Sequence, residues 1–186
     1  MAKTNGKNGS IRNKDRILHT LGDAHSRLYS LETLGEAAER MPIDLSTFND
    51  TVEGLCDRAR KVFAEVSTTL PEGHAARDFL KKASAALDVL EGFAWMAYQG
   101  PEGDQRKVSV STRRILGRGI LAFTGEAGRW MERAELAIDP THIACGYLQD
   151  GYLIAGGEGM TLPRENKAEK VADAARRFAQ EVSAHA

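Results

Sequence analysis

The feature that most constrains this chain is the spacing of its apolar residues. In several segments they recur at alternating steps of three and four positions. That spacing gathers them on one face of an α-helix, whereas a strand would need apolar residues at every second position. The first series consists of Ile17, Leu21, Ala24, Leu28, Leu31 and Ala38. We therefore expect a mainly α protein whose helices bury these faces against one another.

Capping and breaking residues divide the chain into separate helices. The first helix should stop just before Pro42, because proline disfavours the α conformation in its predecessor. Asp44 or Ser46 is a suitable N-cap for the second helix. Residues 69–72, Thr-Leu-Pro-Glu, have the form of a capping box and predict the start of a third helix. That helix should end at Gly100, which is followed by a proline.

A fourth helical series runs from Leu116 to Ala137 and is unusually rich in glycine. Its interior glycines are Gly117, Gly119, Gly125 and Gly128. Each one costs about 1 kcal/mol of helix stability relative to alanine. We expect them to mark places where another helix approaches closely, with backbone exposed to a ligand as the alternative. Asp139 and Pro140 should end this helix.

The sequence changes character after residue 140. Asp150-Gly151 is a favoured two-residue hairpin turn, and Tyr147 and Tyr152 flank it. A last helical series then follows the Thr-Leu-Pro sequence at residues 161–163. The predicted fold is an antiparallel bundle of about five helices with a small β-hairpin near residues 141–155. Residues 1–12 should form a flexible basic tail, and residues 13–186 a single helical domain.

Composition and motifs narrow the function classes. The chain is 42% apolar and 27% charged with a formal net charge of −1, which is typical of a folded globular protein. It offers neither a secretory signal nor about 20 consecutive apolar residues, so we expect a cytoplasmic protein. Cys56 and Cys145 are expected to be idle thiols rather than a disulfide pair.

We find no constellation that predicts catalysis. The five histidines are scattered, and the close pair His142 and Cys145 lacks the further ligands that zinc needs. Neither a nucleophile elbow nor a phosphate-binding glycine loop is present in the sequence. We therefore expect a protein that is not an enzyme and that has no catalytic residue, metal site or cofactor.

Charge is unevenly distributed along the chain. Residues 32–57 carry seven acidic side chains against Arg40 alone, whereas residues 106–118 are basic and contain no acid. The basic set consists of Arg106, Lys107, Arg113, Arg114 and Arg118. It could lie along the acidic helices of the same chain, or it could contact a partner or an anion. Arginine suits the second role because its planar group bonds carboxylates and phosphates through two nitrogens.

The leading hypothesis is a non-catalytic helical protein-binding module of the interaction, assembly or inhibitor type. Its partner would be another protein or the chain itself, as a homo-oligomer, and not a membrane. A nucleic-acid-associated protein that uses residues 106–118 is the alternative. A third hypothesis is a helical bundle that binds a small molecule beneath the hairpin, near Tyr147, Tyr152 and Trp130.

Overall fold

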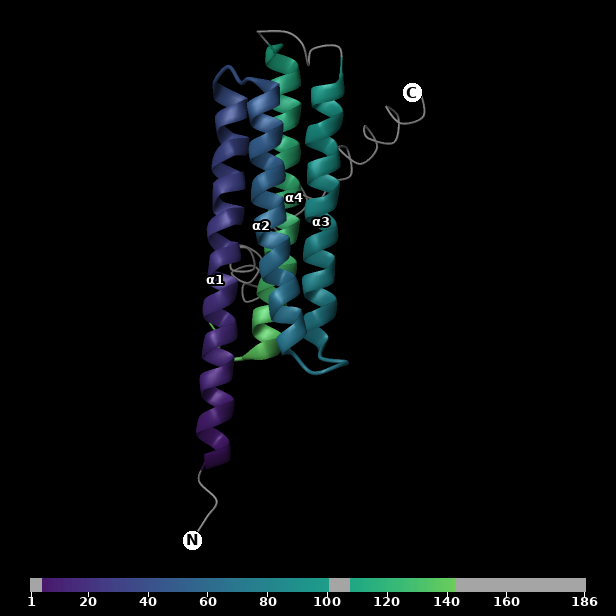
Figure 1. Cartoon of the computed structure of the whole chain (residues 1–186). Coiled ribbons are helices and arrows are strands. Elements are labelled where there is room, and N and C mark those ends of the chain that lie inside the picture. The colour runs from purple at the N-terminus through teal and green to yellow at the C-terminus, as the bar shows by residue number, and fades with distance from the viewer. Residues whose placement is uncertain (1–4, 101–107, 143–186) are drawn as a thin grey trace, which may run out of the picture.

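The computed structural model describes residues 5–100 and 108–142, which form four long helices. These are α1 (Asn5–Arg40), α2 (Leu45–Thr69), α3 (Ala75–Gln99) and α4 (Val110–Ile138), shown in Figure 1. No strand occurs among these residues, so the predicted helical bundle is confirmed for this part of the chain. The predicted fifth helix and residues 143–155 of the predicted hairpin lie outside the described residues. The count of about five helices and the hairpin therefore stay predictions.

The four helices surround one core. Each helix packs against the one before it, and α4 also packs against α1, so the bundle closes on itself with antiparallel neighbours. At 36 residues α1 is the longest helix, about 54 Å at 1.5 Å per residue, and its first turns project past the other helices in Figure 1. It begins at Asn5, inside the segment predicted to be a basic tail. None of the helices in the described ranges combines the length and the apolar character needed to cross a bilayer.

The apolar series predicted from the sequence do face the core. Every member of the first series is buried, and α2, α3 and α4 each bury an apolar face as well. Large residues outside the predicted series complete the core: Phe63, Leu80, Leu87 and Met131. Cys56 is also buried and unpaired, and burial raises the pKa of its thiol to about 12. It is therefore an inert core residue, as expected; Cys145 lies outside the described residues.

Two glycines of α4 allow close helix contacts. A Cβ atom on Gly117 would lie 2.5 Å from the carbonyl oxygen of Gly35 on α1. A Cβ atom on Gly119 would overlap the ring of Phe93 on α3. The prediction of close approach is therefore confirmed at these two positions. It is wrong at Gly125, where a Cβ would meet only the end of the Arg129 side chain.

The helix starts were predicted with mixed success. Asp44 caps α2 as expected, accepting a hydrogen bond from the amide of Thr47 at 3.0 Å. The capping box at residues 69–72 is wrong, because α2 continues through Thr69, whose hydroxyl donates to the carbonyl of Val66. The chain turns at Gly73, at a φ of 76°, and α3 begins only at Ala75. Thr69 thus belongs to the end of one helix rather than to the start of the next.

Candidate interaction surface and a buried histidine–carboxylate cluster

The three described arginines of the basic set differ in exposure and in partners. Arg118 is exposed, but its Nε lies 3.2 Å from Oε1 of Glu39 on α1. Arg113 is half-buried, and its Nε and Nη1 are enclosed without a hydrogen-bond partner. Arg114 is exposed, and no described residue forms an ion pair with it. Within the described residues, Arg118 at the start of α4 is therefore paired with α1, whereas Arg114 is not paired.

The other predicted contacts lie outside the described residues. These are Arg106, Lys107, Tyr147 and Tyr152. The Arg118–Glu39 pair agrees with the intramolecular explanation of the charge pattern, since it joins the basic start of α4 to the acidic half of α1.

Exposed apolar side chains gather where α1 and α3 end and α2 and α4 begin. Six large apolar side chains are exposed in the described part of the chain, and four of them are at this end. We call these four residues the apolar end: Met41 (56% exposed), Trp95 (50%), Val110 (52%) and Ile115 (48%). The rings of Trp95 and Tyr98 lie side by side, with their centroids 5.6 Å apart. Trp95 is therefore supported by its neighbour while much of its surface faces water.

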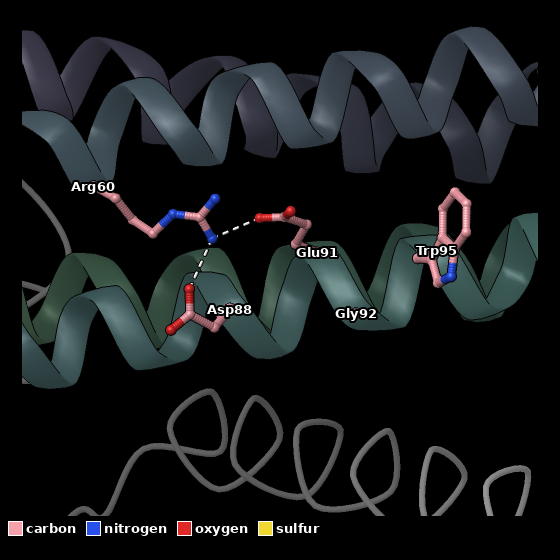
Figure 2. A pocket seen from close by; sticks show the side chains of 5 residues that line it. All are labelled: Arg60, Asp88, Glu91, Gly92 and Trp95. Carbon is pink, nitrogen blue, oxygen red and sulfur yellow. Dashed lines mark hydrogen bonds and ion pairs between the residues drawn. The ribbon is translucent and has the colours of Figure 1, made fainter.

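An open hollow of about 330 Å³ lies beside Trp95, between α2 and α3 (Figure 2). Arg60 reaches across it from α2, with Nη1 2.7 Å from Oδ1 of Asp88 and 2.5 Å from Oε2 of Glu91. Burial lowers the pKa of Arg60, but its hydrogen bonds to Glu91 and Asp88 outweigh this and raise it. Two carboxylates thus already neutralise the charge of Arg60. The hollow therefore has mixed apolar and polar lining and is not a site for an anion.

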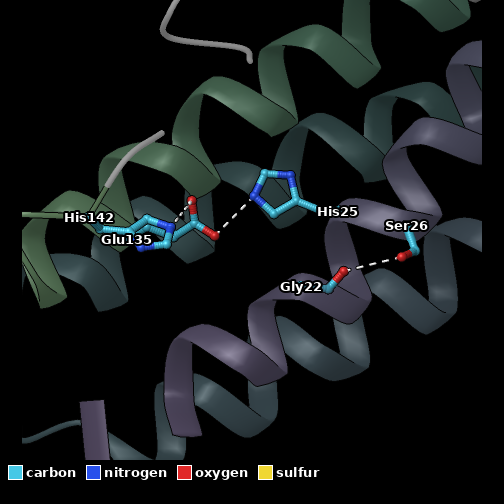
Figure 3. Close-up of polar contacts among 5 residues, drawn as sticks. All are labelled: Gly22, His25, Ser26, Glu135 and His142. Carbon is cyan, nitrogen blue, oxygen red and sulfur yellow. Dashed lines mark hydrogen bonds and ion pairs between the residues drawn. The ribbon is translucent and has the colours of Figure 1, made fainter. Parts of the chain in front are cut away.

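The opposite end of the bundle buries charge instead of exposing apolar surface. Glu135 is 1% exposed on the last turn of α4, and its Oε1 lies 3.0 Å from Nε2 of His25 on α1. Its other oxygen, Oε2, lies 3.8 Å from Nε2 of His142, as Figure 3 shows. Glu132, one turn earlier on α4, is fully buried. We call His25, Glu132, Glu135 and His142 the His–Glu cluster.

The two carboxylates set the protonation of His25. Burial lowers the pKa of this imidazole, but the hydrogen bond to Glu135 and the negative charges of Glu135 and Glu132 together raise it above its usual value. Ser26, also drawn in Figure 3, instead donates to the carbonyl of Gly22 in its own helix. Among residues 5–100 and 108–142, no group of three or more histidine, cysteine, aspartate or glutamate side chains is arranged to hold a metal ion.

Sequence reasoning missed the His–Glu cluster. We had found the histidines scattered and had assigned no role to Glu132 or Glu135. One signal was available, because Glu132 and Glu135 directly follow Met131 and Ala134, which face the core. A charged residue directly after a core-facing residue lies at the border of the buried face of the helix. The histidine on α1 that completes the cluster is 110 positions from Glu135, and local spacing carries no information about that contact.

Comparisons with protein family models, with curated proteins and with solved structures found no match to this chain.

Proposed function

We propose that this protein is a non-catalytic helical interaction module that binds another protein through its apolar end. The partner can be a second copy of the same chain. The observation that carries the proposal is the collection of four half-exposed apolar side chains at one end of the bundle, Met41, Trp95, Val110 and Ile115. A fold that otherwise buries its apolar series has no use for these four groups in its own core.

The residue types at this end suit protein recognition. Tryptophan, tyrosine and arginine are over-represented among the residues that contribute most to protein–protein affinity. Trp95 and Tyr98 provide the aromatic surface, and Arg114 provides a cation that no described residue neutralises. Burying the exposed part of a side chain such as Ile115 contributes on the order of 1 kcal/mol to association.

Arg114 favours a partner that places a carboxylate beside its apolar contact. Arg114 lies beside Ile115 in the sequence, and both side chains are exposed at the start of α4. An aliphatic group of the partner would cover Ile115 or Val110, while a carboxylate would bond to Arg114.

Nucleic acid is the second candidate, because phosphate would also bind Arg114 and the neighbouring Arg118. The Arg118–Glu39 contact weakens this candidate, since one of its cations is already paired within the chain. The two candidates differ in their response to salt. Binding to phosphates loses affinity steeply as salt rises, whereas an interface centred on apolar groups loses little.

The test is an affinity purification from the native host with matched variants. The interface variant carries Arg114→Glu and Ile115→Asp, both at exposed positions of the apolar end. The control carries Lys81→Glu and Val89→Asp, which make the same kinds of change at exposed positions of α3. We expect a protein that the wild type and the control retain in about equal amounts and that the interface variant loses.

If the partner is a second copy, sedimentation equilibrium of the purified proteins should show that the wild type and the control associate equally and that the interface variant associates more weakly. Equal retention and equal association for all three proteins would contradict the proposal. A retained component that nuclease treatment removes would favour the nucleic-acid candidate instead.

A further inference from the structure

The His–Glu cluster contains a buried anion that has histidine as its cationic partner. Glu135 contacts Nε2 of His25 with one oxygen and faces Nε2 of His142 with the other, at 3.0 and 3.8 Å. No lysine or arginine of the described residues forms an ion pair with it. An enclosed carboxylate is strongly unfavourable without a positive partner. The positive charge beside Glu135 therefore depends on protonated imidazole.

The surroundings of the cluster favour that protonation. Glu132 and Glu135 on α4 both act on His25 with negative charge. Asp139, which follows α4, interacts with His142 and with Lys14 of α1. Within the described part of the chain, α2 and α3 contribute no charged group that shifts the pKa of His25. Within the described residues, the ion-pair contacts of Glu135 are thus with the two imidazoles, while Lys14 acts on Asp139.

We propose that the His–Glu cluster is a proton-dependent link that ties the end of α4, and the turn that follows it, to α1. With His25 protonated, Glu135 is neutralised and the contact between the two helices is held. When His25 loses its proton, Glu135 retains a buried negative charge beside Glu132, and the contact weakens. This inference concerns the end opposite the proposed interaction surface and is independent of that function.

The sign of the effect follows from the direction of the shift. An unfolded histidine titrates near 6.5, and the pKa of His25 in the folded protein is higher. The folded state therefore binds the proton more tightly than the unfolded state does. The resulting stability is fully present below about pH 6.5 and is lost as the pH rises through the folded pKa. Raising the pH through the folded pKa of His25 therefore loosens the link.

The direct test is the titration of individual histidines in the full-length wild-type protein by nuclear magnetic resonance. The reference is His25 itself in the urea-unfolded protein, where a histidine titrates near 6.5. We expect the ring protons of His25 to titrate at a higher pH in the folded protein than in the unfolded protein. In folded Glu135→Gln the His25 titration should move down towards the unfolded value, because the amide carries no charge. A wild-type His25 that titrates in the folded protein at or below its unfolded value would overturn the proposal.

The effect on the bundle is measured by urea denaturation between about pH 6 and pH 9, a range that spans the usual histidine value. The urea midpoint of the wild type should fall over this range, and His19→Gln should reproduce that fall. His25→Gln should show a smaller fall, because it has lost the group whose proton is linked to folding. If His25→Gln and the wild type show the same pH dependence, the cluster is not a proton-dependent link. Because the titration needs no variant at position 25, the proposal is tested even if His25→Gln does not fold.

Discussion

At one end of this bundle four large apolar side chains lie half in water, together with Arg114, which forms no ion pair with a described residue, while at the other end two carboxylates lie in the core. Both ends depart from the pattern of apolar residues inside and charged residues outside. They depart in opposite directions. The apolar end leaves in solvent groups that folding could have buried, and the His–Glu cluster buries groups that water would have stabilised.

The two ends therefore differ in what a substitution is expected to affect. Exposed apolar groups cost the folded monomer little and are available to a partner, and we propose that the apolar end serves binding. Buried carboxylates affect the monomer itself, because their solvation has been lost and must be replaced by His25 and His142. A substitution at the His–Glu cluster should therefore change folding, and one at the apolar end should change association.

The largest expected effect on stability is at Glu135. Replacement by alanine removes the carboxylate that pairs with His25 and leaves a space beside Glu132, so we expect a loss of about 3 kcal/mol in unfolding free energy. Glu36→Ala is the matched control at the other end, because Glu36 forms an exposed pair with Arg40. It should cost less than about 0.5 kcal/mol. Urea denaturation, monitored by circular dichroism, measures both losses. Equal losses for the two variants would contradict the proposed difference between the two ends.

The next effect concerns how α1 and α4 touch near the apolar end. Gly117→Ala would place its Cβ against the backbone carbonyl of Gly35, which cannot move without separating the helices. We expect a loss of about 2 kcal/mol. Gly125→Ala, on the same helix, would bring its Cβ only into ordinary contact with the end of the Arg129 side chain, and it should instead stabilise the protein by about 0.5–1 kcal/mol. Thermal denaturation of the two variants checks this. If Gly117→Ala is as stable as the wild type, α1 and α4 do not approach each other as closely as the distance to Gly35 indicates.

The smallest effect on stability is expected at the apolar end itself. Ile115→Ser should change the unfolding free energy by no more than about 0.5 kcal/mol, because the side chain is already half in water. Its neighbour Leu116 is buried in the core, and Leu116→Ala should cost about 2–5 kcal/mol. A large loss for Ile115→Ser in chemical denaturation would show that position 115 serves the fold rather than a partner.

Much of the fold could be predicted because it depends on local periodicity. The series from Ile17 to Ala38 identified the buried face of α1 without any knowledge of the other helices. Cap assignment was less certain, because one residue can serve either side of a turn. Thr69 carries the side chain of an N-cap, yet its hydroxyl bonds back to Val66 and completes the preceding helix.

The candidate sites were harder to predict because they depend on contacts between distant residues. The basic character of residues 113–118 was evident, but only the packing of α4 against α1 pairs Arg118 with Glu39. The exposure of Trp95 is a further example. The helical spacing places Phe93 on the buried face and Trp95 off it, but it does not separate Trp95 from Ala94, which also lies outside the apolar series and is buried.

The most direct test of the central contrast is site-specific photocrosslinking in the native host. A photoreactive residue would replace Ile115 at the apolar end or, as the control, Glu72 in the exposed turn between α2 and α3 at the opposite end. The account predicts a discrete crosslinked species of defined composition from position 115, a homodimer or a complex with one other protein, and none from position 72. Crosslinking of the same species from both positions, or from position 72 alone, would contradict it.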